Sequence, residues 1–71
     1  MRTYLIENNK KQVYGYFYRL YNAKVALTQV MCIDRTAYIL ALDGYKFGEG
    51  QHLYRLKLSL IDGKFRKETI C

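Results

Sequence analysis

Three tyrosines at alternate positions, Tyr14, Tyr16 and Tyr18, are the residues of this sequence best suited to binding chemistry. Successive side chains of a β-strand point to opposite faces, so on a strand these three rings project from one face about 7 Å apart. Aromatic rings at this spacing can stack unpaired bases while nearby Lys and Arg side chains hold the phosphates. The segment therefore predicts a binding surface for single-stranded DNA or RNA.

The same tyrosines allow two other interpretations. Tyr has a high β-propensity, and Leu20 continues the alternation, which is typical of a strand face packed into a core. Tyr and Arg are also enriched at the hot spots of protein interfaces. Core packing and a protein-binding patch therefore stay open beside base stacking.

Basic residues supply the second part of the predicted surface. The chain has 12 Lys and Arg against 6 Asp and Glu, a formal net charge of +6, and the excess lies outside the balanced residues 22–50. A small protein with this charge attracts polyanions, although a solvated basic face without a ligand would look the same in sequence. The candidate phosphate contacts are Lys10, Lys11, Arg19, Arg55, Lys57 and Arg66.

Catalytic chemistry finds little support. His52 is the only histidine, and neither Cys32 nor Cys71 lies near it in the sequence. One His and two distant Cys do not form a metal-ligand pattern, and no Gly-Lys-Ser or Gly-Lys-Thr loop is present for a nucleotide. We therefore expect a protein that is not an enzyme and that has no metal site and no cofactor.

The length of 71 residues predicts a single small domain over residues 1–71. A hydrophobic fraction of 51% argues against disorder. A chain this short buries only about 60% of its unfolded surface, so its core is marginal. We therefore expect that it can form a homodimer by strand-edge pairing or through a shared apolar face.

Short segments separated by Asn, Asp and Gly indicate β-strands. The expected breaks are residues 8–11, 22–23, 34–36, 43–44, 48–50 and 62–63. Asp43-Gly44 and Asp62-Gly63 are typical of two-residue type I′ hairpins. The pattern predicts a mainly β protein, a small antiparallel meander or barrel of about six strands.

Alternation around the two Asp-Gly turns predicts the strand register. Residues 53–61 place Tyr54, Leu56, Leu58 and Leu60 on one face and Arg55, Lys57 and Ser59 on the other. The expected cross-strand pairs are Leu60–Phe65, Leu58–Lys67, Leu56–Thr69 and Lys57–Glu68 about the second turn, and Leu42–Tyr45 and Leu40–Phe47 about the first.

Residues 23–33 fit two kinds of element. As a strand, Val25, Leu27, Met31 and Ile33 share a face, and we favour this interpretation. The alternative is a helix near residues 23–32, capped by Asn22, which would make the protein an α+β domain with one short helix.

The sequence as a whole predicts a non-catalytic binding module whose favoured partner is nucleic acid. The alternative is a small protein that inhibits or modulates another protein, of the kind encoded by a phage or mobile element. The chain shows no apolar signal segment, and no uncharged run is long enough to cross a bilayer. We expect a cytoplasmic protein with no membrane partner and with reduced cysteines.

Overall fold

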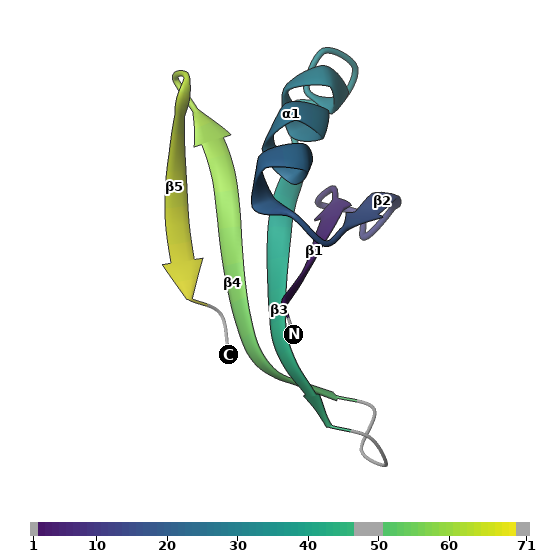
Figure 1. The fold of residues 1–71 in the computed structure, drawn as a ribbon. Coiled ribbons are helices and arrows are strands. Elements are labelled where there is room, and N and C mark those ends of the chain that lie inside the picture. The colour runs from purple at the N-terminus through teal and green to yellow at the C-terminus, as the bar shows by residue number, and fades with distance from the viewer. Residues whose placement is uncertain (1, 47–50, 70–71) are drawn as a thin grey trace.

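The computed structural model describes residues 2–46 and 51–69, and the side chains within 2–42 and 56–69. Its elements are β1 (Arg2–Glu7), β2 (Val13–Phe17), α1 (Leu20–Val30), β3 (Tyr38–Lys46), β4 (Gln51–Ile61) and β5 (Lys64–Thr69). The strands form one antiparallel sheet in the order β2-β1-β3-β4-β5, with α1 against one face (Figure 1). The predicted mainly β, antiparallel fold is confirmed, with five strands where about six were expected.

Helix α1 occupies most of the segment for which a strand was favoured, so that interpretation is wrong and the helical alternative is correct. Ala23 and Leu27 lie one turn apart and are fully buried against the sheet. The β-branched Val25 and Thr28 point to solvent, so their weak helix propensity is outweighed by burial of the apolar stripe. The helix begins at Leu20 with Arg19 as its N-cap residue, which places the expected break at Asn22 inside the first turn.

The main core lies between α1 and the face of the sheet that it covers. Its fully buried large side chains are Ile6 from β1, Leu27 from α1 and Ile39 from β3. Full burial of a side chain of this size stabilises the fold by about 1.5–3 kcal/mol. Ala41 is also fully buried on this face, and its small side chain takes up little of the space beneath the helix.

The hairpin expected at Asp62-Gly63 is confirmed. Both residues have positive φ angles, 52° and 77°, as a type I′ turn requires. The observed register has the predicted pairs Leu60–Phe65, Leu58–Lys67, Leu56–Thr69 and Lys57–Glu68.

The hairpin expected at Asp43-Gly44 is wrong, because both residues lie within β3. Leu42 pairs with Arg55 and Tyr45 with His52, in place of the predicted Leu42–Tyr45 pair. β3 has a neighbour on each side, β1 and β4, so a continuous strand forms more ladder hydrogen bonds than a turn at this point would allow. Leu40 pairs with Leu5 and with Lys57, so the predicted Leu40–Phe47 pair is also wrong. The connection between β3 and β4 falls in residues 47–50, so the expected break at 48–50 lies outside the described residues.

The face of the sheet opposite α1 is called the open face below. A second group of buried side chains lies on it: Leu5 from β1, and Tyr38, Leu40 and Leu42 from β3.

In the part of the chain that the structure describes, no helix has the length and apolar character needed to cross a membrane.

Candidate functional site

The strand register brings predicted binding residues from distant parts of the sequence onto the open face. Tyr16 pairs with Leu5, Leu5 with Leu40, and Leu40 with Lys57, so Tyr16 and Lys57 lie in one row across four strands. Three strand spacings separate them by about 14 Å. Arg66 follows in the neighbouring row, opposite Ser59.

The three predicted tyrosines are not equivalent. Tyr16 is 65% exposed on β2, whereas Tyr18 lies beyond the end of the strand and is 77% exposed. The β1–β2 pairing shifts its register between Ile6 and Glu7, and the Tyr14 hydroxyl donates a hydrogen bond of 2.7 Å to Asp34 in the loop after α1. The expected stripe of three rings on one strand is therefore not formed, because β2 ends at Phe17.

A further exposed ring, Tyr21, was missed by sequence reasoning. It lies in the first turn of α1 and is 68% exposed, and Arg19 beside it is also exposed. A helix that starts at Leu20 with Ala23 and Leu27 on its buried side places Tyr21 on its exposed side, but the predicted helix started after Asn22 and so left Tyr21 out. Tyr16, Tyr18 and Tyr21 are called the aromatic edge below.

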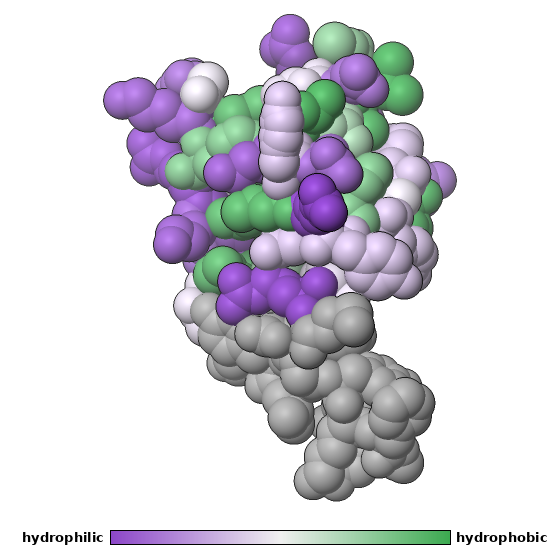
Figure 2. Space-filling view, in the orientation of Figure 1, coloured by the Kyte–Doolittle hydropathy of each residue, from purple (hydrophilic) through white to green (hydrophobic). Residues whose placement is uncertain are grey.

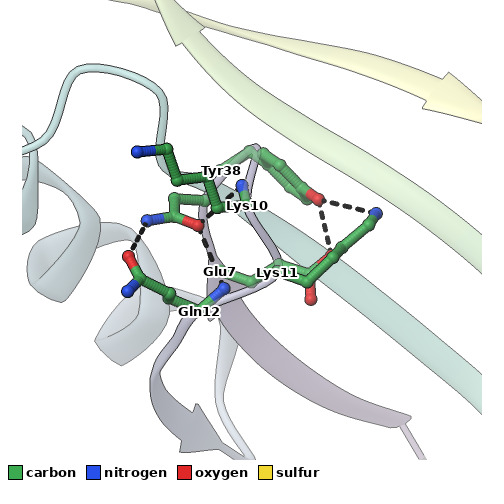
Figure 3. A network of polar contacts seen from close by, with 6 residues as sticks. Glu7, Lys10, Lys11, Gln12 and Tyr38 are labelled. Atoms are coloured by element: carbon green, nitrogen blue, oxygen red, sulfur yellow. Dashed lines mark hydrogen bonds and ion pairs between the residues drawn. The ribbon is translucent and has the colours of Figure 1, made fainter.

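Polar contacts fix the turn between β1 and β2, where the expected break at residues 8–11 is confirmed (Figure 3). The buried Asn8 side-chain oxygen accepts hydrogen bonds from the backbone N–H groups of Lys10 and Gln12, at 2.9 and 3.0 Å. Its amide nitrogen donates to the side-chain oxygen of Gln12 at 2.8 Å and to Asp34 at 2.9 Å. The turn therefore holds Lys11 at a positive φ of 66°.

A second polar group joins this turn to the open face. The Tyr38 hydroxyl donates to the buried carboxylate of Glu7, and Lys11 Nζ lies 3.4 Å from that hydroxyl and 3.6 Å from the carboxylate (Figure 3). Lys57 Nζ lies 4.4 Å from the centre of the Tyr38 ring, a cation–π contact. The pKa of the Tyr38 hydroxyl is raised, mainly because the group is partly buried and secondly because it donates a hydrogen bond to Glu7. The pKa of Lys11 is also raised, and the largest cause is its hydrogen bond to Tyr38.

The predicted phosphate contacts therefore differ in their surroundings. Lys11 and Lys57 have the internal partners just described, although the Lys11 side chain is 76% exposed. Lys10, Arg19 and Arg66 are also exposed. Arg55 lies on β4 opposite Leu42, but its side chain is outside the described part of the structure.

Asp34 lies at the centre of the loop between α1 and β3, where the break expected at residues 34–36 is confirmed. Its carboxylate accepts hydrogen bonds from the hydroxyl and backbone N–H of Thr36, at 2.6 and 2.9 Å. It also accepts from Tyr14 and from Asn8. These donors, Thr36 first, hold the pKa of Asp34 well below its usual range. The ionised carboxylate thus links β2, the β1–β2 turn and the loop after α1.

We expect Asp34→Asn to reduce the loss of stability in acid. Because the folded state lowers the pKa of Asp34, the stabilisation from its carboxylate is fully present above the ordinary pKa of about 3.9 and is lost as the pH falls toward the lower folded value. Melting temperatures between about pH 6 and pH 2 should therefore fall less steeply in the variant than in the parent. Parallel curves for the two proteins would contradict the prediction.

Among the described residues, the remaining candidates for chemistry lie apart from one another. Among residues 2–46 and 51–69 no group of three or more His, Cys, Asp or Glu side chains could hold a metal ion. Cys32 is exposed just after α1, where its thiol lies 3.6 Å from the backbone oxygen of Thr28. His52 contributes only its backbone to the described structure, and Cys71 lies outside it.

Comparison of the chain with models of known protein families, with curated proteins and with solved structures finds no match. A functional interpretation therefore rests on the aromatic edge, the open face and the charges beside them.

Proposed function

We propose that the protein is a non-catalytic module that binds single-stranded nucleic acid along the aromatic edge and the adjoining open face. The observation that carries the proposal is the exposure of Tyr16, Tyr18 and Tyr21, at 65%, 77% and 68%, within one short segment of a strongly basic protein. Rings this exposed contribute little to the core. Their flat faces are free to stack bases, which is a sequence-tolerant way to bind a single strand.

The surroundings of these rings favour a polyanion. Arg19 stands at the N-terminus of α1, where no side chain caps the helix and the first turn has no acidic residue. The unpaired amides at a helix N-terminus attract negative charge, and a guanidinium can bind a phosphate through two hydrogen bonds. Lys10 adds an exposed cation in the turn at the other end of β2, and Lys57 and Arg66 lie on the open face.

The alternative, a protein-binding modulator, would use the same tyrosines as interface anchors. The dependence of the binding affinity on salt concentration distinguishes the two functions. Binding to phosphates weakens steeply as salt rises, because each neutralised phosphate releases counterions. A protein interface built on desolvated tyrosines should change much less with salt.

Tyr16→Ala tests the proposal. We expect the affinity for a single-stranded oligonucleotide to fall by about 1–3 kcal/mol. The melting temperature should change little, since the ring is mostly exposed. Ile33→Ala is the matched control, because Ile33 is 81% exposed in the loop after α1 and away from the aromatic edge. Fluorescence anisotropy with a labelled oligonucleotide measures the affinity. Absence of binding by the parent protein, or equal losses in the two variants, would show that the tyrosines do not bind nucleic acid.

The homodimer expected from the sequence stays a prediction. The two edge strands of the sheet differ in their charge: β2 contains no charged residue, whereas β5 carries Lys64, Arg66 and Lys67 beside a single acidic residue, Glu68. Lysines on an edge strand oppose pairing with another chain. If two copies pair through their sheets, we therefore propose that they do so through β2.

A further inference from the structure

A groove of about 240 Å³ lies between α1 and the β4–β5 hairpin, on the side of the sheet opposite the open face. Leu56 and Leu58 of β4 form part of its floor, and Leu20 of α1 and Phe65 of β5 contribute to its walls. Leu56 and Phe65 are only half-buried, at the margin of the main core. Figure 2 views the molecule from this side and shows apolar surface broken by hydrophilic patches.

The groove exists because one helix is too narrow for the sheet. Five strands about 4.8 Å apart span about 19 Å between the outer two. A helix with its side chains is about 10–12 Å wide. α1 packs over β1, β2 and β3, and the ribbon view shows β4 and β5 to one side of it (Figure 1). The axes of packed helices lie about 8–10 Å apart, so a second helix beside α1 would lie over β4.

Positive charge surrounds this apolar surface. The described residues that line the groove include Arg2, Lys24 and Lys67 and no acidic side chain. Lys24 Nζ reaches from α1 to within 4.8 Å of the centre of the Phe65 ring. Lys67 lies opposite Leu58 and so projects to the same face from β5. The cations thus stand on both sides of an apolar floor.

We infer that the groove binds an acidic amphipathic helix of a partner protein. The apolar stripe of such a helix would pack on Leu56, Leu58 and Phe65, and its flanking Asp and Glu would pair with Lys24 and Lys67. This is the helix-in-groove mode of recognition. A second copy of the chain fits the groove poorly, because its net charge of +6 would bring cations against cations. The groove and the open face lie on opposite sides of the sheet, so this surface is additional to the open face, and it adjoins the aromatic edge only where Tyr21 lies beside Leu20 and Lys24.

The probe for this inference is a labelled synthetic helix of about 14 residues, about 21 Å long, with Leu at i, i+3, i+4 and i+7 and Glu on both flanks. We expect binding by fluorescence anisotropy at micromolar concentration, and a loss of about tenfold or more in the Lys24→Glu, Lys67→Glu double variant. The matched control is Arg35→Glu, Lys64→Glu, which has the same net charge but changes exposed residues outside both the groove and the proposed nucleic-acid surface. If charge reversal unfolds the domain, Lys24→Ala with Lys67→Ala gives the same comparison.

Three results would overturn the inference. The first is no binding of the peptide, or equal weakening by the groove and control variants, which would show attraction by net charge alone. The second is binding of a single-stranded oligonucleotide that the groove variant loses and the control variant keeps, because nucleic acid would then occupy the groove. The third is a sedimentation mass near twice 8.5 kDa that only the groove variant abolishes, because a second copy would then occupy it.

Discussion

Leu27→Ala is expected to lower the free energy of unfolding by about 2–5 kcal/mol. Leu27 is fully buried between α1 and the sheet, so its truncation removes apolar contacts and leaves a cavity. A domain of this length has a total stability of only about 4–10 kcal/mol. The variant should therefore unfold at much lower urea concentrations than the parent, as followed by circular dichroism.

Val25→Ala is the control for this prediction, on the same helix. Val25 is 44% exposed, so its truncation should change the stability by about 0.5 kcal/mol or less. Equal effects of the two substitutions would contradict the packing of α1 through Ala23 and Leu27. A fully unfolded Leu27→Ala variant together with a folded Val25→Ala variant would support this packing of α1.

Tyr38→Phe is expected to destabilise the fold by about 1–3 kcal/mol. The substitution keeps the ring that lies beneath the ammonium group of Lys57 but removes the hydroxyl that donates to Glu7. The buried Glu7 carboxylate is then left with the ion pair to Lys11, at 3.6 Å, as its remaining described side-chain contact. Urea unfolding at neutral pH measures the effect. An unchanged midpoint would show that the hydroxyl does not matter for stability.

The double variant Tyr38→Phe, Glu7→Gln separates the hydrogen bond from the rest of the Tyr38 contacts. The double variant should lose less stability than the sum of the losses in the two single variants, because removing both partners leaves no buried charge unpaired.

The parent protein should also lose stability in alkali. The folded state raises the pKa of Tyr38, so the stabilisation from the neutral hydroxyl is present below the ordinary pKa of about 10 and disappears as the pH rises through the folded value. Tyr38→Phe should lack this loss.

The sequence predicted the C-terminal hairpin correctly because all the information it needs is local. Asp62-Gly63 sets the turn, and the alternation on each side sets the register from Leu60–Phe65 outward. The same Asp-Gly signal misled at residues 43–44, because the long-range pairing of β1 with β3 continues through Asp43. The residue types of a turn carry no information about a neighbouring strand that is distant in the sequence, such as β1 beside β3.

The candidate site was predicted in part. The common face of Lys57 and Arg66 follows from strand alternation about the Asp62-Gly63 turn. The exposure of Tyr16 was one of the alternatives that the sequence left open, and its row with Lys57 depends on the order of the strands. Tyr21 required the start of α1 at Leu20, which the residue types between Leu20 and Val30 leave ambiguous. The contacts of Glu7 with Tyr38 join residues from different strands, so they depend on a strand order that local patterns do not determine.

The position of β1 between β2 and β3 bears on how the chain folds. The β4–β5 hairpin closes across a two-residue turn, whereas β1 reaches β3 only after β2 and α1 have been bridged, as the Leu5–Leu40 pair illustrates. The entropy lost in closing a loop grows with its length. Completion of this sheet therefore requires an encounter between the first and middle parts of the chain, and we expect the folding rate to depend on that long-range encounter more than on the speed of the local hairpin.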